Sequence, residues 1–265
     1  MDCGGPTTNK DKLLVIMGAT GAGKSRLSLD LTACFPPATF EVINADKMQV
    51  YKGLDITTNK LPVPERLGVP HHLLGEFDSL DGEVTPAKFR ELAAQAVSGV
   101  ISRRKVPVLV GGSNSFIHAL VVDLFEPGFN VFDGDSVTVS ISSELRYNCC
   151  FLWVDVSLVV LTEYLSKRVD EMLDGDAAEL AEFYNSVEDD SVVRTGIRKS
   201  IGVASSAGIL GSTRRREVAR RWGTMTRYEE KHTGRNEKTG IGGRRFGKER
   251  VVGPSVKIVN HFLEE

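Results

Sequence analysis

Short apolar segments alternate with longer segments of helical periodicity through the first two thirds of the chain. Apolar runs of strand length lie at 13–17, 40–43, 106–110 and 151–156. Helical patterns lie between and after them, at 24–35, 85–101, 113–122 and 157–173. Continuous apolar strands alternating with helices are typical of a parallel sheet whose two faces are both covered. The pattern therefore predicts an α/β fold, with helices on both faces of a parallel sheet.

The pattern weakens beyond residue 203. Residues 204–265 contain nine glycines and scattered arginines, with only a helix near 215–222 and a strand at 256–259 suggested by their apolar positions. This segment carries 14 Lys and Arg against 7 Asp and Glu, although the whole chain has a net charge of -2. We expect a core over 1–203 and a basic, Gly/Arg-rich tail over 204–265, partly disordered. Such a tail can bind nucleic acid.

The bulk composition is that of a globular protein. Apolar residues make up 41% of the 265 residues and charged residues 26%, and no apolar run approaches the roughly 18 residues of a membrane span. The cysteines lack zinc-site spacing and indicate reduced thiols. Residues 1–12 are too short and polar for a signal or transit peptide. We therefore expect a cytoplasmic protein, with a plastid or mitochondrion as the alternative if the true N-terminus is longer.

A complete phosphate-loop motif, G-x-x-x-x-G-K-[ST], follows the first predicted strand and opens the first predicted helix. Its residues are Gly18, Ala19, Thr20, Gly21, Ala22, Gly23, Lys24 and Ser25. Glycines let backbone N–H groups turn inward around a phosphate, and the helix N-terminus adds a partial positive charge. Lys24 supplies a point charge, and the Ser25 hydroxyl can hold Mg²⁺. The motif predicts a polyphosphate site on a P-loop NTPase-like fold; a glycine turn that binds nothing is the alternative.

Asp46 lies at the carboxyl end of the second predicted strand. In an open parallel sheet, that edge faces the ligand, beside the phosphate loop. A carboxylate there can bind magnesium or water, or accept a proton from an incoming nucleophile, and helix capping is an equally good explanation for an isolated Asp. Two histidines, His71 and His72, follow a proline. A metal role for them would need further ligands, so a structural role is favoured.

Several segments occur in the order seen in isopentenyltransferases. They are the phosphate loop, 44–60, 69–73, 108–117, 168–173 and 196–202. The sequences Gly-Gly-Ser-Asn-Ser-Phe-Ile at 111–117 and Leu-Arg-Tyr-Asn-Cys-Cys-Phe at 145–151 more closely resemble the plant adenylate isopentenyltransferases. The tRNA-modifying relatives usually have a threonine after the paired glycines. The resemblance covers residues 12–203, and the tail does not match the family.

The resemblance implies transfer of the dimethylallyl group of dimethylallyl diphosphate to the N6-amine of AMP, ADP or ATP. The phosphate loop, with Mg²⁺ at Ser25, would then hold the donor diphosphate, and Asp46 would take the N6 proton. By the same resemblance, Thr20 lies near both reacting groups and Arg146 clamps the diphosphate. Acceptor contacts would come from Gln49, Ser113, Asn114 and Lys199. For Ser113 and Asn114 helix capping is the alternative, and Lys199 is equally well explained as a solvated charge.

Other functions remain as alternatives. The same chemistry on an anticodon-loop adenosine of tRNA would give the basic tail a purpose, but no Cys/His zinc module follows the core. A degenerate protein that binds the donor without turnover would explain the unmatched tail. A small-molecule kinase is disfavoured by the segment around Asp46. We expect a monomer that does not act at a membrane, and the sequence does not rank the three nucleotides as acceptors.

Overall fold

The computed structural model describes residues 10–78, 82–127, 144–168, 179, 197 and 248–265. Within them, five strands form one parallel sheet in the order β3-β2-β4-β1-β5. The strands are β1 (Lys12–Gly18), β2 (Phe40–Asn44), β3 (His71–His72), β4 (Val106–Gly111) and β5 (Asn148–Val154). The predicted α/β fold is therefore confirmed. The sequence pattern missed β3, which is only two residues long.

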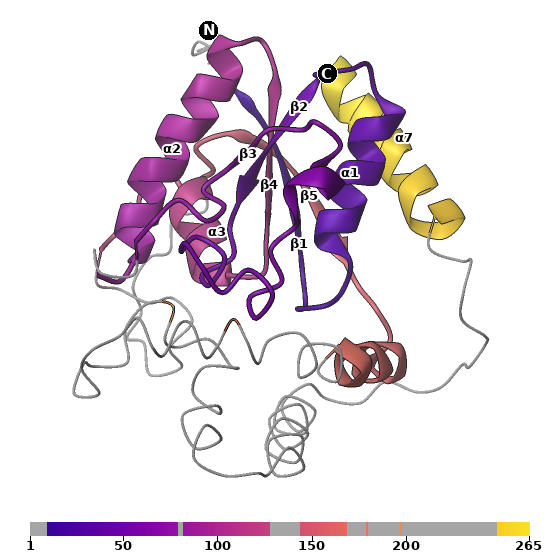
Figure 1. The fold of residues 1–265 in the computed structure, drawn as a ribbon. Coiled ribbons are helices and arrows are strands. Elements are labelled where there is room, and N and C mark those ends of the chain that lie inside the picture. The colour runs from indigo at the N-terminus through magenta and orange to yellow at the C-terminus, as the bar shows by residue number, and fades with distance from the viewer. Residues whose placement is uncertain (1–9, 79–81, 128–143, 169–178, 180–196, 198–247) are drawn as a thin grey trace, which may run out of the picture.

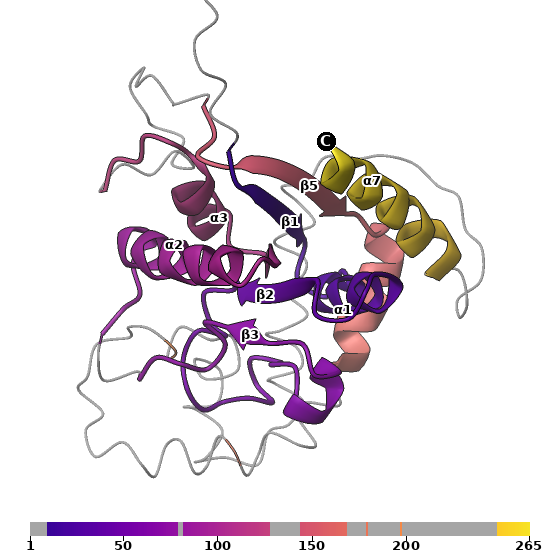
Figure 2. The same ribbon diagram turned by 90° about the horizontal axis from the view of Figure 1, so that it is seen from above.

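Helices cover both faces of the sheet (Figures 1 and 2). One face carries α2 (Pro86–Ser102) and α3 (Asn114–Val121), and the other carries α1 (Lys24–Cys34) and α7 (Gly253–Glu264). A further helix occupies 158–168, and single turns lie at η1 (Val63–Arg66) and η4 (Lys248–Val252). The start of α2 follows its sequence, because the Thr85 side chain accepts a hydrogen bond from Lys88 N and Pro86 occupies the first turn.

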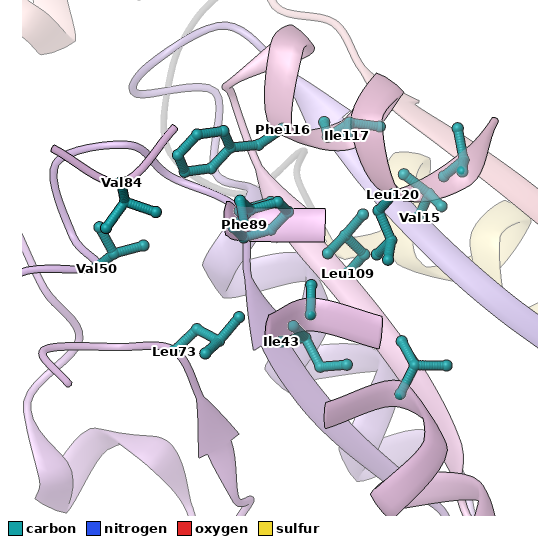
Figure 3. Packing of buried hydrophobic residues seen from close by; sticks show 14 of the residues in the cluster. Val15, Ile43, Val50, Leu73, Val84, Phe89, Leu109, Phe116, Ile117 and Leu120 are labelled. Carbon is teal, nitrogen blue, oxygen red and sulfur yellow. The ribbon is translucent and has the colours of Figure 1, made fainter. Parts of the chain in front are cut away.

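The core on the α2/α3 face is built from the alternate side chains of the strands and the inward stripe of each helix. Figure 3 shows Val15, Ile43 and Leu109 of the sheet packed under Phe89, Phe116 and Leu120 of the helices. The rings of Phe89 and Phe116 are stacked, with centroids 4.2 Å apart and planes 11° apart. Ile197, from the family-like segment 196–202, is fully buried in the same cluster. This packing fixes α3, and with it the loop between β4 and α3.

The predicted strand at 256–259 is wrong, because those residues lie in α7. The four-residue window Val-Lys-Ile-Val looks strand-like, but the longer window is helical: Ser255, Val259 and Phe262 are buried at spacings of four and three. Pro254 in the first turn also favours a helix. The Lys12 ammonium donates to Leu263 O at 2.9 Å and lies over the Phe262 ring. This end of the tail therefore packs on the core, whereas the helix predicted at 215–222 lies outside the described residues.

We expect Val259→Ala to destabilise the protein by about 2 kcal/mol, because it removes two fully buried methyl groups and leaves a cavity between α7 and the sheet. Its neighbour Ile258 is half exposed, so Ile258→Ala should change stability by no more than about 0.5 kcal/mol. Urea unfolding of the two variants measures the difference. Equal, small effects would mean that α7 does not contribute to the folded core.

Candidate active site

The phosphate loop has the form that its sequence predicted. It leaves β1 at Gly18 and enters α1 at Lys24, with Gly23 as the N-cap in the left-handed region (φ 89°). No side chain caps this end of α1, so the first-turn N–H groups point toward the loop without a side-chain acceptor. The Lys24 ammonium and Ala22 N both donate to Ala19 O, at 2.7 and 3.2 Å. The loop therefore presents N–H groups, an ammonium and the exposed Thr20 and Ser25 hydroxyls at one edge of the sheet.

The ends of β2 and β4 lie beside this loop because the sheet is parallel. Ala45 N donates to Val110 O at 2.8 Å, which extends the ladder by one residue beyond β2. A Cβ on Gly111 would lie 2.2 Å from Ala45 O, so only glycine allows the two backbones to approach so closely. A Cβ on Gly112 would lie 3.4 Å from Gly18 O and 3.6 Å from the Lys24 ammonium. The paired glycines therefore bring the Asp46 segment and the phosphate loop together.

Asp46 and Lys24 interact electrostatically across this junction. The pKa of the Lys24 ammonium is lowered, mainly by burial. The Asp46 carboxylate partly offsets this shift, and the positive charge of Arg168 adds to it. The Asp46 Oδ1 atom accepts from Met48 N at 2.9 Å and Gln49 N at 3.3 Å, which fixes the carboxylate on its turn. The site thus holds a positioned carboxylate within the field of the phosphate-loop lysine.

The helix at 158–168 packs against the phosphate loop at Gly21, and its last residue, Arg168, acts electrostatically on Lys24. Gly21 has φ 80°, a backbone conformation that favours glycine, and a Cβ there would lie 2.9 Å from the Leu165 side chain and 3.3 Å from that of Tyr164, so the helix packs closely on the loop. Sequence reasoning placed residue 168 in a family segment but gave it no role. The sequence gives only a partial signal, because the chain leaves β5 at the same edge as the phosphate loop, whereas the position of the last helical residue depends on how the helix packs.

The prediction that Arg146 clamps the donor diphosphate at the phosphate loop is wrong. Arg146 precedes β5, whose first residue pairs with Lys12, whereas the phosphate loop begins at Gly18 at the other end of β1. Seven strand residues at roughly 3.3 Å each separate the two edges by about 20 Å. The Arg146 guanidinium lies over the Tyr147 ring, and the backbone N–H of Arg146 donates to Val121 O at 2.8 Å.

The predicted acceptor residues Gln49, Ser113 and Asn114 lie at the edge of the sheet beside the phosphate loop, but the side chains of Gln49 and Ser113 already have hydrogen-bond partners. The Ser113 hydroxyl accepts from Lys47 N at 2.9 Å and makes no capping bond to α3, so it ties the Asp46 turn to α3. The Gln49 amide donates to Thr58 O and Asn59 O, both at 3.0 Å. Asn114 is exposed at the start of α3, and its acceptor contact stays a prediction. Lys199 lies outside the described residues.

The donor set suits magnesium only together with a bound phosphate. In the described part of the chain, no group of three His, Cys, Asp or Glu side chains could hold a metal ion. Mg²⁺ is commonly bound by one or two protein oxygens, waters and substrate phosphates, and the exposed Ser25 hydroxyl at the start of α1 would be the protein oxygen here. His71 and His72 instead have structural partners, Val69 O at 2.8 Å and the Glu41 carboxylate at 2.7 Å.

Among the described residues, no helix has the length and apolar character of a membrane span.

Similarity to known sequences agrees with this site. Residues 49–131 match the family model described as IPP transferase. An adenylate isopentenyltransferase of Humulus lupulus is 66% identical over 194 residues, which are 71% of this chain and 58% of the relative. Adenylate isopentenyltransferase 1, chloroplastic, of Arabidopsis thaliana is 54% identical over 200 residues, 75% of this chain and 55% of the relative. The chain thus spans a little over half the length of these relatives.

Solved structures share the fold. A tRNA delta(2)-isopentenylpyrophosphate transferase from Staphylococcus epidermidis superposes with a TM-score of 0.75 at 20% identity, covering 95% of this chain and 99% of that one. A eukaryotic dimethylallyltransferase acting on tRNA superposes with a TM-score of 0.70 at 24% identity, covering 83% of this chain and 68% of that one. The structural matches show that the fold is shared, and the sequence identities show that the proteins are homologous. The chain belongs to the isopentenyltransferase family.

Proposed function

We propose that the protein transfers the dimethylallyl group of dimethylallyl diphosphate to the N6-amine of an adenine nucleotide, AMP, ADP or ATP. The observation that carries the proposal is the carboxylate of Asp46 held on its turn beside Lys24 of the phosphate loop. A diphosphate site next to a proton acceptor suits alkylation of an amine by an allylic diphosphate. The identity to plant adenylate isopentenyltransferases supports the free nucleotide as acceptor.

The residues divide the chemistry between two sides of the junction. The allylic carbon–oxygen bond breaks, and its electron pair stays on the diphosphate, whose growing charge the loop N–H groups, Lys24 and Arg168 stabilise. Mg²⁺ bound by the Ser25 hydroxyl and diphosphate oxygens would neutralise further charge there. The N6 nitrogen forms the new bond to carbon and gives its proton to Asp46. Prenylated nucleotide and diphosphate are the products.

A turnover assay with separate acceptors tests this function. The purified chain is incubated with Mg²⁺ and dimethylallyl diphosphate, and AMP, ADP, ATP or an anticodon stem-loop RNA is added in parallel reactions. Prenylated nucleotide supports the proposal and ranks the acceptors. Product on the RNA alone would assign the chain to tRNA modification, as in the structural neighbours named for tRNA. Absence of product from folded protein that binds the diphosphate would favour a degenerate family member.

Arg168 and Arg146 give a matched pair for the donor site. We expect Arg168→Gln to weaken binding of inorganic diphosphate by about 10-fold, because it removes a charge-assisted hydrogen-bond donor next to Lys24. Arg146→Gln should leave the affinity unchanged, since that side chain lies at the other edge of the sheet. Isothermal titration calorimetry with diphosphate measures both. Loss of affinity in the Arg146 variant alone would mean that Arg146, and not Arg168, binds the diphosphate.

Oligomeric state and compartment are proposals of the same kind. We propose a monomer, which light scattering tests directly. For the compartment, relatives named chloroplastic and mitochondrial in Arabidopsis favour the organelle alternative over the cytosol. A fluorescent fusion to the product of the complete gene distinguishes them.

A further inference from the structure

A carboxylate distant in sequence holds the loop that follows the Asp46 segment. Glu179 Oε1 accepts from Ile56 N at 3.1 Å, and its Oε2 accepts from Thr57 N at 3.0 Å and the Thr57 hydroxyl at 2.9 Å. The Glu179 side chain thus takes three hydrogen bonds from two consecutive residues more than a hundred positions away. Hydrogen bonds to a charged carboxylate are roughly twice as strong as those between neutral groups, and the two-oxygen contact also fixes the orientation of the loop.

The loop held in this way, residues 54–60, is a compact turn. Thr58 N and the Thr58 hydroxyl donate to Leu54 O at 2.9 and 2.7 Å, and Lys60 N donates to Asp55 O at 2.8 Å. The Lys60 ammonium, almost fully buried, also bonds to the Asp55 carboxylate at 2.8 Å. Residues 54–60 are therefore held together by their own hydrogen bonds, and a contact that fixes the N–H groups of Ile56 and Thr57 restrains the whole turn.

Gln49 connects this turn to Asp46. Its side-chain amide donates to Thr58 O and Asn59 O, and its backbone N–H donates to the Asp46 carboxylate. A continuous series of hydrogen bonds thus runs from the Glu179 carboxylate, through the 54–60 turn and Gln49, to the Asp46 carboxylate. None of these bonds involves the phosphate loop.

We propose that Glu179 is a positioning residue for the reaction: it fixes the 54–60 turn and, through Gln49, the orientation of the Asp46 carboxylate. The inference deepens the proposed function, on which its kinetic consequence rests. A misplacement of a catalytic group by about 1 Å can lower a rate by about 100-fold. Because the diphosphate site is built from β1, α1 and the helix at 158–168, loss of Glu179 should affect proton transfer and leave donor binding intact.

Hydrogen exchange of single amides, followed by NMR, tests the positioning without reference to turnover. Glu179→Gln keeps the size of the side chain but places an NH₂ group against an N–H donor, so the amides of Ile56 and Thr57 should exchange about 10-fold faster. The amides of Met48 and Gln49, which donate hydrogen bonds to the Asp46 carboxylate, should also exchange faster. Faster exchange at 56 and 57 with no change at 48 and 49 would overturn the proposal. Glu65→Gln, at an exposed carboxylate of η1, is the control.

Kinetics give the second readout. In Glu179→Gln, kcat should fall by about 10- to 100-fold while KM for dimethylallyl diphosphate stays unchanged. Thr57→Val, which removes one donor to Glu179, should show a smaller loss, and Thr57→Ser, which restores the hydroxyl, should recover wild-type kcat. Equal kcat in wild-type and Glu179→Gln enzyme would overturn the inference. Absence of turnover in the wild type would overturn the proposed function instead, and the exchange at 48 and 49 would still decide whether Glu179 positions Asp46.

Discussion

Asp46→Asn lowers dimethylallyl transfer by about 10²–10⁴ in kcat while the protein still binds the donor diphosphate. The expected size is that of a positioned general base. Asparagine has the shape of aspartate and keeps an oxygen that can accept from Met48 N and Gln49 N, so the turn should survive and only the proton acceptor is lost. Single-turnover kinetics measure the chemical step, and calorimetry with diphosphate measures the donor site.

The control for this variant is Asp123→Asn, the same change at an exposed carboxylate just beyond α3. It should have wild-type turnover and wild-type stability. If Asp46→Asn retained near-normal turnover, another group would have to accept the N6 proton. If it lost diphosphate binding as well, the Asp46 carboxylate would act on the donor side, and the division of labour between Asp46 and the phosphate loop would be wrong.

The parts of the site that could be predicted from sequence are those set by local rules. The phosphate loop is a contiguous motif between a strand and a helix, and the structure has it in that place. Asp46 meets it because strands of a parallel sheet end at one edge. The position of Asp46 thus depends only on where the strands end, and the apolar runs predict the strand boundaries to within three residues, as in β5.

The predictions that were wrong concern residues whose positions depend on contacts distant in sequence. Arg146 and Arg168 flank the same strand and its following helix, yet only the second lies at the phosphate loop, because residues before a parallel strand belong to its amino edge. The tail gave a similar error: the four residues 256–259, three of them apolar, look like a strand on their own, whereas the burial of Val259 and Phe262 in α7 depends on packing against α1 and the sheet. Glu179 carried no local signal at all, since its partners at Ile56 and Thr57 are set by tertiary structure.

A buried carboxylate within β2 was another long-range feature. Glu41 lies inside an apolar run, and its side chain is only 3% exposed. It accepts from Arg103 Nη2 at 2.6 Å, Lys105 Nζ at 2.8 Å and His72 Nε2 at 2.7 Å, so the end of α2, the start of β4 and the short strand β3 all converge on it. Burial by itself would raise the pKa of the Glu41 carboxyl, but these hydrogen bonds together outweigh it and lower that pKa from 4.5 to about 2.

Glu41→Gln should therefore destabilise the protein by about 3–5 kcal/mol, since it leaves Arg103 and Lys105 facing a neutral amide. Glu91→Gln, which breaks only the exposed pair with Lys88, should cost less than about 1 kcal/mol. Because the folded-state pKa is depressed, the stabilisation by Glu41 is complete above about pH 4.5 and is lost as the pH falls toward 2. Urea unfolding across this range should show the gap between wild type and Glu41→Gln closing by about 1.4 kcal/mol per pH unit below 4.5. A gap that stayed constant with pH would mean that the charge of Glu41 does not hold these three elements together, and that the substitution acts through packing alone.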